Sequence, residues 1–373
     1  MSVGLEVAVI LTGIGVAAVA VANNARTVTP YSFLLAKVRA WEARLLTDAV
    51  IQSLAESPSL EALLSALRGT HYETDLESTD ADVESIERML DAYLASCYRN
   101  VLELLPKDAS RFLERYAERI DLGNLKLVIE AVAGRVERED AISHLRDGML
   151  FSKDRLEVMA RAETLEELVE LLSYTSYYDD LKRQIEPGEY DVSDLLRAVE
   201  HCYYTSVWRE AGNLGRRNRR MARLILGREI DLQNVKLILR LKRESVDPGL
   251  ISKNLIPVEG ELKHELLDLC SRADGVEEAA QILMRSRLKA VLTPILSQGT
   301  GDLGRIENLL DESLLNYSKS LSLFHPLTIA TPLCFLQQIQ AEVRNMRAVA
   351  RGVADGVPAD EVKELLLRSA RVE

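Results

Sequence analysis

The segment Ile120–Leu127 reads IDLGNLKL, and the segment Ile230–Leu237 reads IDLQNVKL. In both copies an acid is followed by an asparagine three positions later and by a base five positions later. A weaker third copy, EVRNMR, repeats this order 111 residues after the second. A period of this length is the size of a domain, so the phrase predicts three similar units. The matching positions are Asp121, Asn124 and Lys126, then Asp231, Asn234 and Lys236, then Glu342, Asn345 and Arg347.

The residues around the phrase repeat as well. LEALLSALRGTHYETDL at Leu60–Leu76 aligns with LEELVELLSYTSYYDDL at Leu165–Leu181, which lies 105 positions further on. In the third copy, Val276–Leu288 keeps only the apolar periodicity. We therefore expect an N-terminal segment at residues 1–26 and three helical units at residues 27–145, 146–250 and 251–373.

The composition favours helices over strands. The chain is 47% hydrophobic and 28% charged, and Leu, Ala, Glu and Arg recur in amphipathic runs. No segment alternates apolar and polar residues for long, so the sequence predicts an all-α protein. The expected helices are Leu60–Arg68, Val83–Leu105, Ala109–Val136, Lys153–Tyr174, Val192–Glu210, Asn218–Arg243, Glu261–Ser271, Gly275–Leu296, Leu303–Leu321 and Pro332–Val353, after a first one in TPYSFLLAKVRAWEARLL.

The asparagine of the phrase lies on an apolar stripe. On one helix Asn124 lines up with Leu113, Tyr116, Ile120, Leu127 and Ala131. A buried amide needs hydrogen-bond partners, so the favoured interpretation is that Asn124, Asn234 and Asn345 each satisfy a group across a helix pair. An alternative is that Asp121 and Asp231 cap new helices, which the unbroken third copy disfavours.

Several classes of site are not indicated. The four cysteines lack metal-ligand spacing and the five histidines form no ligand cluster, so we expect reduced, buried thiols and no metal or cofactor. The net charge of −12 disfavours a nucleic-acid binder. The residues in question are Cys97, Cys202, Cys270 and Cys334, with His71, His144, His201, His264 and His325.

The N-terminal segment differs from the rest of the chain. Val7–Ala25 contains no charged residue, and 19 residues of helix would span about 28 Å, close to the thickness of a hydrocarbon core. Arg26 and Lys37 follow it and would place the next residues on the cytoplasmic side. A hydrophobic membrane anchor is the favoured interpretation, and a cleaved signal or a helix packed on the core are the alternatives.

GTGDLG at Gly299–Gly304 matches the glycine pattern of dinucleotide-binding loops. That pattern requires a preceding strand and a βαβ unit, whereas helical repeats flank it here. A loop between helices is the expected structure.

GRRNRRMAR contains five arginines within eight positions, and Arg216, Arg219, Arg220 and Arg223 would share one helix face. The first interpretation is a solvated face paired with glutamates. The second is a contact with anionic lipid or with an acidic rotor surface.

Together, the triplicated units and the segment HPLTIATPLCFLQQIQAEVRNMRAVARGVADGVPADEV near the C-terminus resemble the C subunit of archaeal A-type (V/A-type) ATPases, a relative of the d subunit of vacuolar ATPases. The resemblance begins near Tyr31 and implies a funnel of three pseudo-threefold helical domains. It further implies a non-catalytic central-stalk subunit at the cytoplasmic face of the membrane. The implied partners are the central-shaft subunits and the membrane proteolipid ring. Most members of that family begin near the residue equivalent to Tyr31, so the resemblance implies no role for the N-terminal apolar segment.

Two other functions stay open at this point. One is a helical-repeat scaffold tethered to the membrane. The other is a nucleotide-binding protein that uses GTGDLG.

Overall fold

The structure is a computed structural model that describes residues 31–76, 79–186, 188, 190–298 and 302–368. Within these residues every regular element is a helix, which confirms the all-α prediction. The expected anchor Val7–Ala25 lies outside the described residues. Among the helices that are described, none combines the length and the apolar character needed to cross a bilayer.

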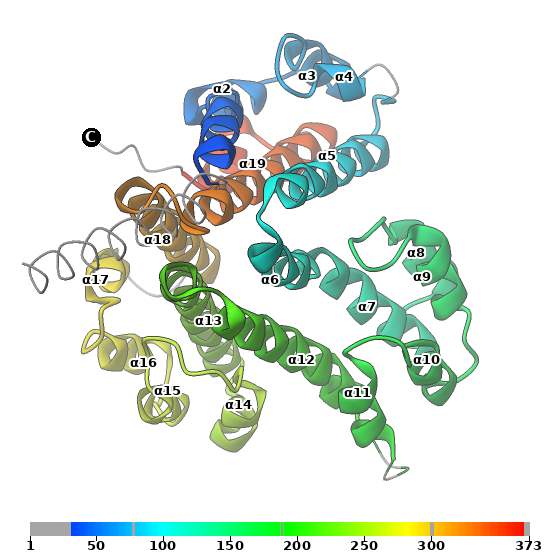
Figure 1. Ribbon diagram of the computed structural model, residues 1–373, viewed down its shortest axis with the longest axis vertical. Coiled ribbons are helices and arrows are strands. Elements are labelled where there is room, and N and C mark those ends of the chain that lie inside the picture. The colour runs from blue at the N-terminus through cyan, green and yellow to red at the C-terminus, as the bar shows by residue number, and fades with distance from the viewer. Residues whose placement is uncertain (1–30, 77–78, 187, 189, 299–301, 369–373) are drawn as a thin grey trace, which may run out of the picture.

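The helices form three groups around a common centre (Figure 1). The first group combines residues 31–42 and 48–104 with the C-terminal helices α19 and α20, the second lies around α7 and α12, and the third lies around α13 and α18. The bounds are as follows. The first group contains α2 (Asp48–Leu54), α3 (Leu60–Ala66), α4 (Glu73–Leu76), α5 (Val83–Leu104), α19 (Ala330–Ala354) and α20 (Ala359–Leu365). After the connecting helix α6 (Lys107–Ala117), the second contains α7 (Arg119–Val132), α8 (Arg138–His144), α9 (Lys153–Ala160), α10 (Leu165–Leu171), α11 (Tyr178–Ile185) and α12 (Val192–Asn213). The third contains α13 (Arg216–Arg243), α14 (Pro248–Asn254), α15 (His264–Ser271), α16 (Val276–Leu283), α17 (Lys289–Gln298) and α18 (Leu303–Phe324).

Short polar side chains set where the short helices begin and end. Ser59 and Thr164 accept hydrogen bonds from backbone N–H groups in the first turns of α3 and α10. Further on, the hydroxyls of Thr70, Thr175 and Ser286 each donate to the backbone carbonyl three residues earlier. A hydroxyl bonded in this way competes with the helix ladder and favours a turn.

This turn chemistry explains why two of the predicted helices are too long. Lys153–Tyr174 divides into α9 and α10 where Thr164 starts a new helix. Gly275–Leu296 divides into α16 and α17 around Ser286. The apolar periodicity continues through both breaks, so periodicity alone could not reveal them.

The prediction of one helix at Ala109–Val136 is also wrong, because α6 ends at Ala117 and α7 begins at Arg119. The break does not come from capping by Asp121, which lies within α7 and bonds elsewhere. Instead the N–H of Glu118 bonds to the carbonyls of the two and three residues before it, which tightens the turn. In the third group, α13 passes the matching position without a break.

The three asparagines of the repeated phrase make the same contact. Each side-chain amide exchanges two hydrogen bonds with the backbone of the residue 22 positions later: Asn124 with Arg146, Asn234 with Ile256, and Asn345 with Leu367. All three side chains are buried. Each asparagine therefore fixes the segment that follows its own helix.

The acids of the phrase hold the same connections a few residues further on. Asp121 accepts hydrogen bonds from the backbone N–H groups of residues 149–151, and Asp231 from those of residues 261 and 262. Glycine permits this close approach, because a Cβ at Gly148 would lie 1.7 Å from Asp121 Oδ1 and one at Gly260 would lie 2.5 Å from Asp231 Oδ1.

In the third copy the acid joins the two ends of the chain. Glu342 accepts hydrogen bonds from Leu46 N at 2.6 Å and Tyr72 Oη at 2.9 Å, and it lies 2.8 Å from His71 Nε2. His71, to which the sequence assigned no role, thus lies against this carboxylate. Nearby, Lys363 of α20 pairs with Glu56 at 2.6 Å. The first group is therefore assembled from both ends of the chain.

The asparagine contacts predict a stability loss. Replacing Asn234 by Leu leaves a buried N–H and a buried carbonyl of Ile256 without partners, which costs about 1–3 kcal/mol of unfolding free energy. We expect the same direction for Asn124→Leu and Asn345→Leu, measured from urea-unfolding midpoints. The exposed Asn213→Leu serves as control and should change the free energy by less than about 0.5 kcal/mol. Wild-type midpoints for all three buried variants would contradict the assignment.

The environment of Asp231 predicts a pH dependence. Burial raises its pKa to about 7, although hydrogen bonds from Leu262 and Glu261 N–H act against this shift. A folded state that binds the proton more tightly than the unfolded state is most stable below the ordinary Asp pKa, and that stability is lost as pH rises through about 7. A shift of about three units corresponds to at most ~4 kcal/mol.

The test compares urea unfolding of the wild type and Asp231→Asn at pH values below and above this window. We expect the wild type to lose more stability than the variant as pH rises. The exposed Asp360→Asn is the control and should follow the wild type. Parallel pH profiles for the wild type and Asp231→Asn would refute the shift.

Candidate functional site

The bases of the repeated phrase tie each group together. Lys126 of α7 pairs with Glu200 of α12 at 2.8 Å, and Lys236 of α13 pairs with Asp311 of α18 at 2.7 Å. In the first group the corresponding pair is Arg347 of α19 with Asp91 of α5. Short connections lead from α12 to α13 and from α18 to α19, and α6 leads from α5 to α7. Ion pairs and chain connections therefore alternate around a closed circuit of helices.

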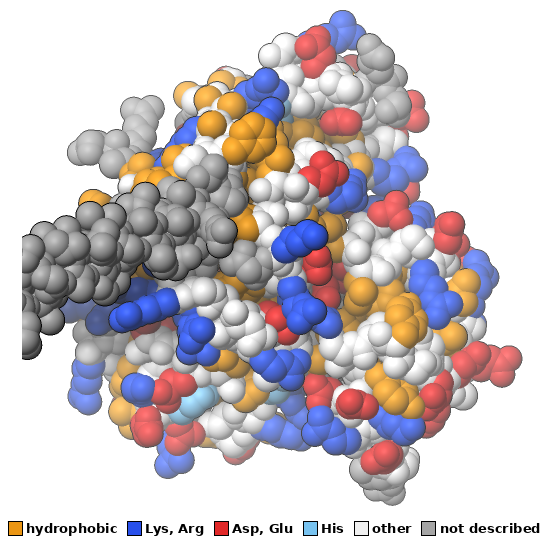
Figure 2. Space-filling model, viewed as in Figure 1, with side chains coloured by type: hydrophobic (Ala, Val, Ile, Leu, Met, Phe, Trp, Pro, Cys, Tyr) orange, Lys and Arg blue, Asp and Glu red, His pale blue; other side chains and the backbone are white. Residues whose placement is uncertain are grey.

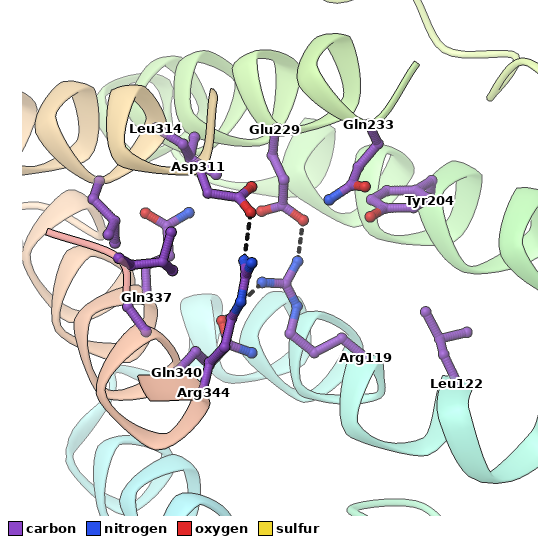
Figure 3. A pocket seen from close by; sticks show the side chains of 13 residues that line it. Arg119, Leu122, Tyr204, Glu229, Gln233, Asp311, Leu314, Gln337, Gln340 and Arg344 are labelled. Atoms are coloured by element: carbon purple, nitrogen blue, oxygen red, sulfur yellow. Dashed lines mark hydrogen bonds and ion pairs between the residues drawn. The ribbon is translucent and has the colours of Figure 1, made fainter. Parts of the chain in front are cut away.

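Three side chains from the three groups meet at the centre of this circuit. Arg119 of α7, Glu229 of α13 and Gln340 of α19 each stand two positions before the acid of the repeated phrase. The Arg119 guanidinium forms an ion pair with Glu229 and donates to Gln340 Oε1 at 3.2 Å (Figure 3). Side chains thus fill the centre at this level.

Tyrosines surround the charged group. Arg119 donates to Tyr116 Oη at 2.8 Å and to Tyr203 Oη at 3.2 Å. The Tyr116 hydroxyl also donates a hydrogen bond to Glu229 Oε2 at 3.3 Å and accepts one from Gln337 Nε2 at 3.4 Å. Burial acts to lower the pKa of Arg119, but the Glu229 carboxylate and the tyrosines outweigh it and raise the pKa, so Arg119 keeps its charge.

A pocket of about 330 Å³ opens beside this central cluster. Its polar lining includes Gln233, Asp311 and Arg344, in addition to the central residues (Figure 3). Arg344 pairs with Asp311 at 2.7 Å, so this acid joins two bases. The charges that line the pocket are already paired, which suits a stiff polar surface better than a catalytic centre.

The described residues offer neither a metal site nor a recognisable cofactor site. No cluster of acids, histidines or cysteines suitable for a metal occurs in the described part of the chain. The four cysteines are buried and free. Residues 299–301 of GTGDLG lie outside the described residues, and helices α17 and α18 stand on either side.

The arginine-rich segment forms the start of α13. Arg216, Arg219, Arg220 and Arg223 are exposed, and none forms an ion pair with an acid that the structure describes. Arg219 donates to the Leu214 carbonyl at 3.1 Å, and the Arg223 guanidinium lies 5.2 Å from the Trp208 ring. The glutamate pairing that the sequence suggested for this face does not occur among these residues.

The central cluster was missed by reasoning from the sequence. A signal was present, because charged residues precede two of the repeated acids by two positions: Arg119 before Asp121 and Glu229 before Asp231. Their opposite signs at matching positions suggest a contact across the centre, but this follows only if the three units surround one axis.

Comparison with known proteins gives one consistent result. The sequence model of the ATP synthase (C/AC39) subunit family matches residues 34–365. The C subunit of the A-type ATP synthase from Thermococcus gammatolerans is 31% identical over 91% of this chain and 91% of its own length. The proteins of the same name from Pyrococcus abyssi and Methanocaldococcus jannaschii are 29% and 27% identical, over 91% of this chain and over 90% and 86% of their own lengths. By this match, which covers nearly all of the described residues, the chain belongs to the ATP synthase (C/AC39) subunit family.

Proposed function

We propose that this protein is a non-catalytic central-stalk subunit that couples the rotor shaft of an A/V-type rotary ATPase to its membrane proteolipid ring. The observation that carries the proposal is the closed circuit of helices, with the Arg119–Glu229 ion pair at its centre. Torque transmission requires stiffness, and packed helices cross-linked by ion pairs supply it. The names of the relatives support the assignment to such a complex.

The three groups would act as three pseudo-threefold units of a funnel. The Asn124, Asn234 and Asn345 contacts support this, because each fixes a segment at the same spacing. In this view the central cluster closes the bottom of the funnel, and the pocket beside Arg344 and Gln233 belongs to the socket that receives the shaft. We keep the units 27–145, 146–250 and 251–373 as the proposed repeats of the sequence. They do not coincide with the spatial groups, since α7 and α13 pack with the segments that follow them, whereas α19 packs most closely with α5.

The protein would lie at the cytoplasmic face of the membrane. Val7–Ala25 would serve as a tether that inserts into or against the proteolipid ring, in line with its Gly and Ala spacing. Arg216, Arg219, Arg220 and Arg223 are the candidate surface toward ring or membrane. A membrane-tethered scaffold for soluble partners is the alternative function, and no contact in the described residues favours it.

The proposal is tested by assembly and coupling. Full-length protein mixed with the shaft subunits and the proteolipid ring should join both in one complex, and it should show no thermal shift with saturating ATP or NAD. Ion pumping per ATP hydrolysed should fall when the protein is omitted. Binding to neither shaft nor ring would leave the scaffold as the better account.

If the circuit of helices must be stiff, removing a more buried ion pair should reduce stability and coupling more than removing an exposed one. Lys236→Met removes a partner of the partly buried Asp311 and should lower the unfolding free energy by about 1–3 kcal/mol and reduce pumping per ATP. The matched variant Lys126→Met removes a pair whose two side chains are about one-third exposed, 36% and 35%, and should cost less than about 1 kcal/mol. If Lys236→Met lowers the stability but leaves the pumping per ATP unchanged, the ion-pair circuit stabilises the fold without contributing to torque transmission.

The tether predicts a change in solubility. Full-length protein should partition into detergent or membrane, whereas a chain that begins at Thr27 should be soluble and still bind the shaft. We expect the shortened chain to bind the ring at least about tenfold more weakly, since burying apolar surface contributes about 25 cal/mol per Å² before ordering costs. A freely soluble, monomeric full-length protein, or mature protein that lacks residues 1–25, would refute the tether.

A further inference from the structure

Three segments that are far apart in the sequence meet at Asn218. The Asn218 amide donates to Tyr31 Oη at 2.9 Å, and its Oδ1 accepts from Ile329 N at 3.0 Å. On the same side, Arg39 donates to Ser322 Oγ at 3.4 Å, which fastens residues 31–42 to the end of α18. The start of α13, the end of α18 and residue 31 therefore share one surface, which we call the N-terminal face.

The N-terminal face carries exposed apolar side chains. Phe324 is 80% exposed, Phe33 57% and Leu323 45%. These side chains lie at the end of α18 and the start of residues 31–42, and Lys37 Nζ lies 5.9 Å from the Phe33 ring. Large apolar groups next to basic ones on a surface mark a site of interaction with a protein or a membrane.

The same face is basic although the whole chain carries a net charge of −12. Arg216, Arg217 and Arg220 are exposed in the first turns of α13, which contain no acid. No acid in the described ranges pairs with them. In Figure 1 the start of α13 lies toward the viewer, and Figure 2 shows Lys and Arg side chains on this side of the molecule, with acidic side chains among them.

Helix stability does not account for these arginines. The N-terminus of a helix carries a partial positive charge, so cations in its first turn are unfavourable there, and anions are favoured. Arginines that oppose the helix dipole, without an acid beside them, fit a surface that meets an external anion. Their spacing on an exposed face suits many anionic groups in a plane better than one enclosed ligand.

Chain length places this face close to any membrane that holds the N-terminal segment. Only five residues lie between Ala25 and Tyr31. An extended chain spans at most about 3.6 Å per residue, so Tyr31 lies within about 20 Å of the end of that segment. A tether this short holds the N-terminal face at the bilayer surface.

We propose that the N-terminal face binds the anionic phospholipid headgroups of a bilayer through Arg216, Arg217 and Arg220, with Phe33, Leu323 and Phe324 in the interfacial layer. The inference rests on the membrane location proposed above, but not on binding of the shaft. Basic residues attract anionic lipid within a Debye length, and Phe and Leu side chains next to basic ones insert into the interfacial layer. The face would therefore orient the protein on the membrane as well as hold it there.

The test measures binding of the full chain to two kinds of vesicle, phosphatidylcholine alone and phosphatidylcholine mixed with phosphatidylglycerol. We expect tighter binding to the mixed vesicles, and less preference as salt rises. The combined variant Arg216→Glu, Arg217→Glu, Arg220→Glu should weaken binding to mixed vesicles at least about tenfold and leave binding to neutral vesicles unchanged. The matched reversal at Arg161, Arg183 and Arg272, which are exposed in α11 or at the ends of α9 and α15, should bind as the wild type does.

The apolar part is tested separately. Phe33→Ser with Phe324→Ser should weaken binding to both kinds of vesicle, whereas Tyr174→Ser with Leu250→Ser, of comparable exposure before α11 and on α14, should not. Equal binding of the wild type to neutral and mixed vesicles, or no effect of the arginine reversal, would overturn the lipid inference.

One outcome would assign a different partner to the N-terminal face. If the arginine reversal weakens binding to the isolated proteolipid ring but not to mixed vesicles, the face recognises an acidic rotor surface, and the lipid inference fails while the proposed function stands. Shaft binding, measured in the same variants, should stay unchanged. If the wild type did not bind the shaft, that result would count against the proposed function but not against the lipid inference.

Discussion

The largely buried charge of Arg119, whose side chain is 13% exposed, is the constraint on which the arrangement of the three groups depends. A guanidinium at the centre of a helical protein is tolerated only if acceptors surround it, because an unpaired buried charge costs several kcal/mol. Two of its acceptors come from the other two groups, Glu229 on α13 and Gln340 on α19, and they add to the hydroxyls of Tyr116 and Tyr203. Moving any of the three helices outward would leave a charge or an amide unpaired, so the centre holds all three in place.

Much of this fold could be predicted from one repeated phrase, and the limits of that prediction are physical. The buried asparagine was predictable because an amide on an apolar stripe requires partners, but its partner 22 residues later was not, since no pattern marks a backbone group as an acceptor. The helix break at Glu118 depends on backbone hydrogen bonding that apolar periodicity does not record. The exposed Phe324 carries no sequence signal, because its exposure is decided by which helices pack nearby.

The order of packing explains why the sequence repeats and the spatial groups are offset. Each phrase-bearing helix fixes the segment that comes after it, through its asparagine and its acid. In α19, Asn345 still fixes Leu367, whereas Glu342 takes Leu46 and Tyr72 from the first group's early segments. Closure of the circuit therefore depends on pairing the two ends, and long-range contacts of this kind form at a greater entropic cost than local ones.

A polar centre specifies a single packing register for three similar groups, and an apolar centre would not. If identical leucines met at the centre, the three helices could pack in several registers with nearly equal free energy, as loosely specified apolar cores do. Arg119, Glu229 and Gln340 are three different side chains at matching positions, and only one arrangement pairs the acid with the base while the amide completes the guanidinium's bonds. Burying the ion pair costs desolvation energy, and its benefit is that wrong registers leave a charge unpaired. In a protein proposed to transmit torque, a single stiff register at the axis is worth that cost, because any slip there would turn the shaft without turning the ring.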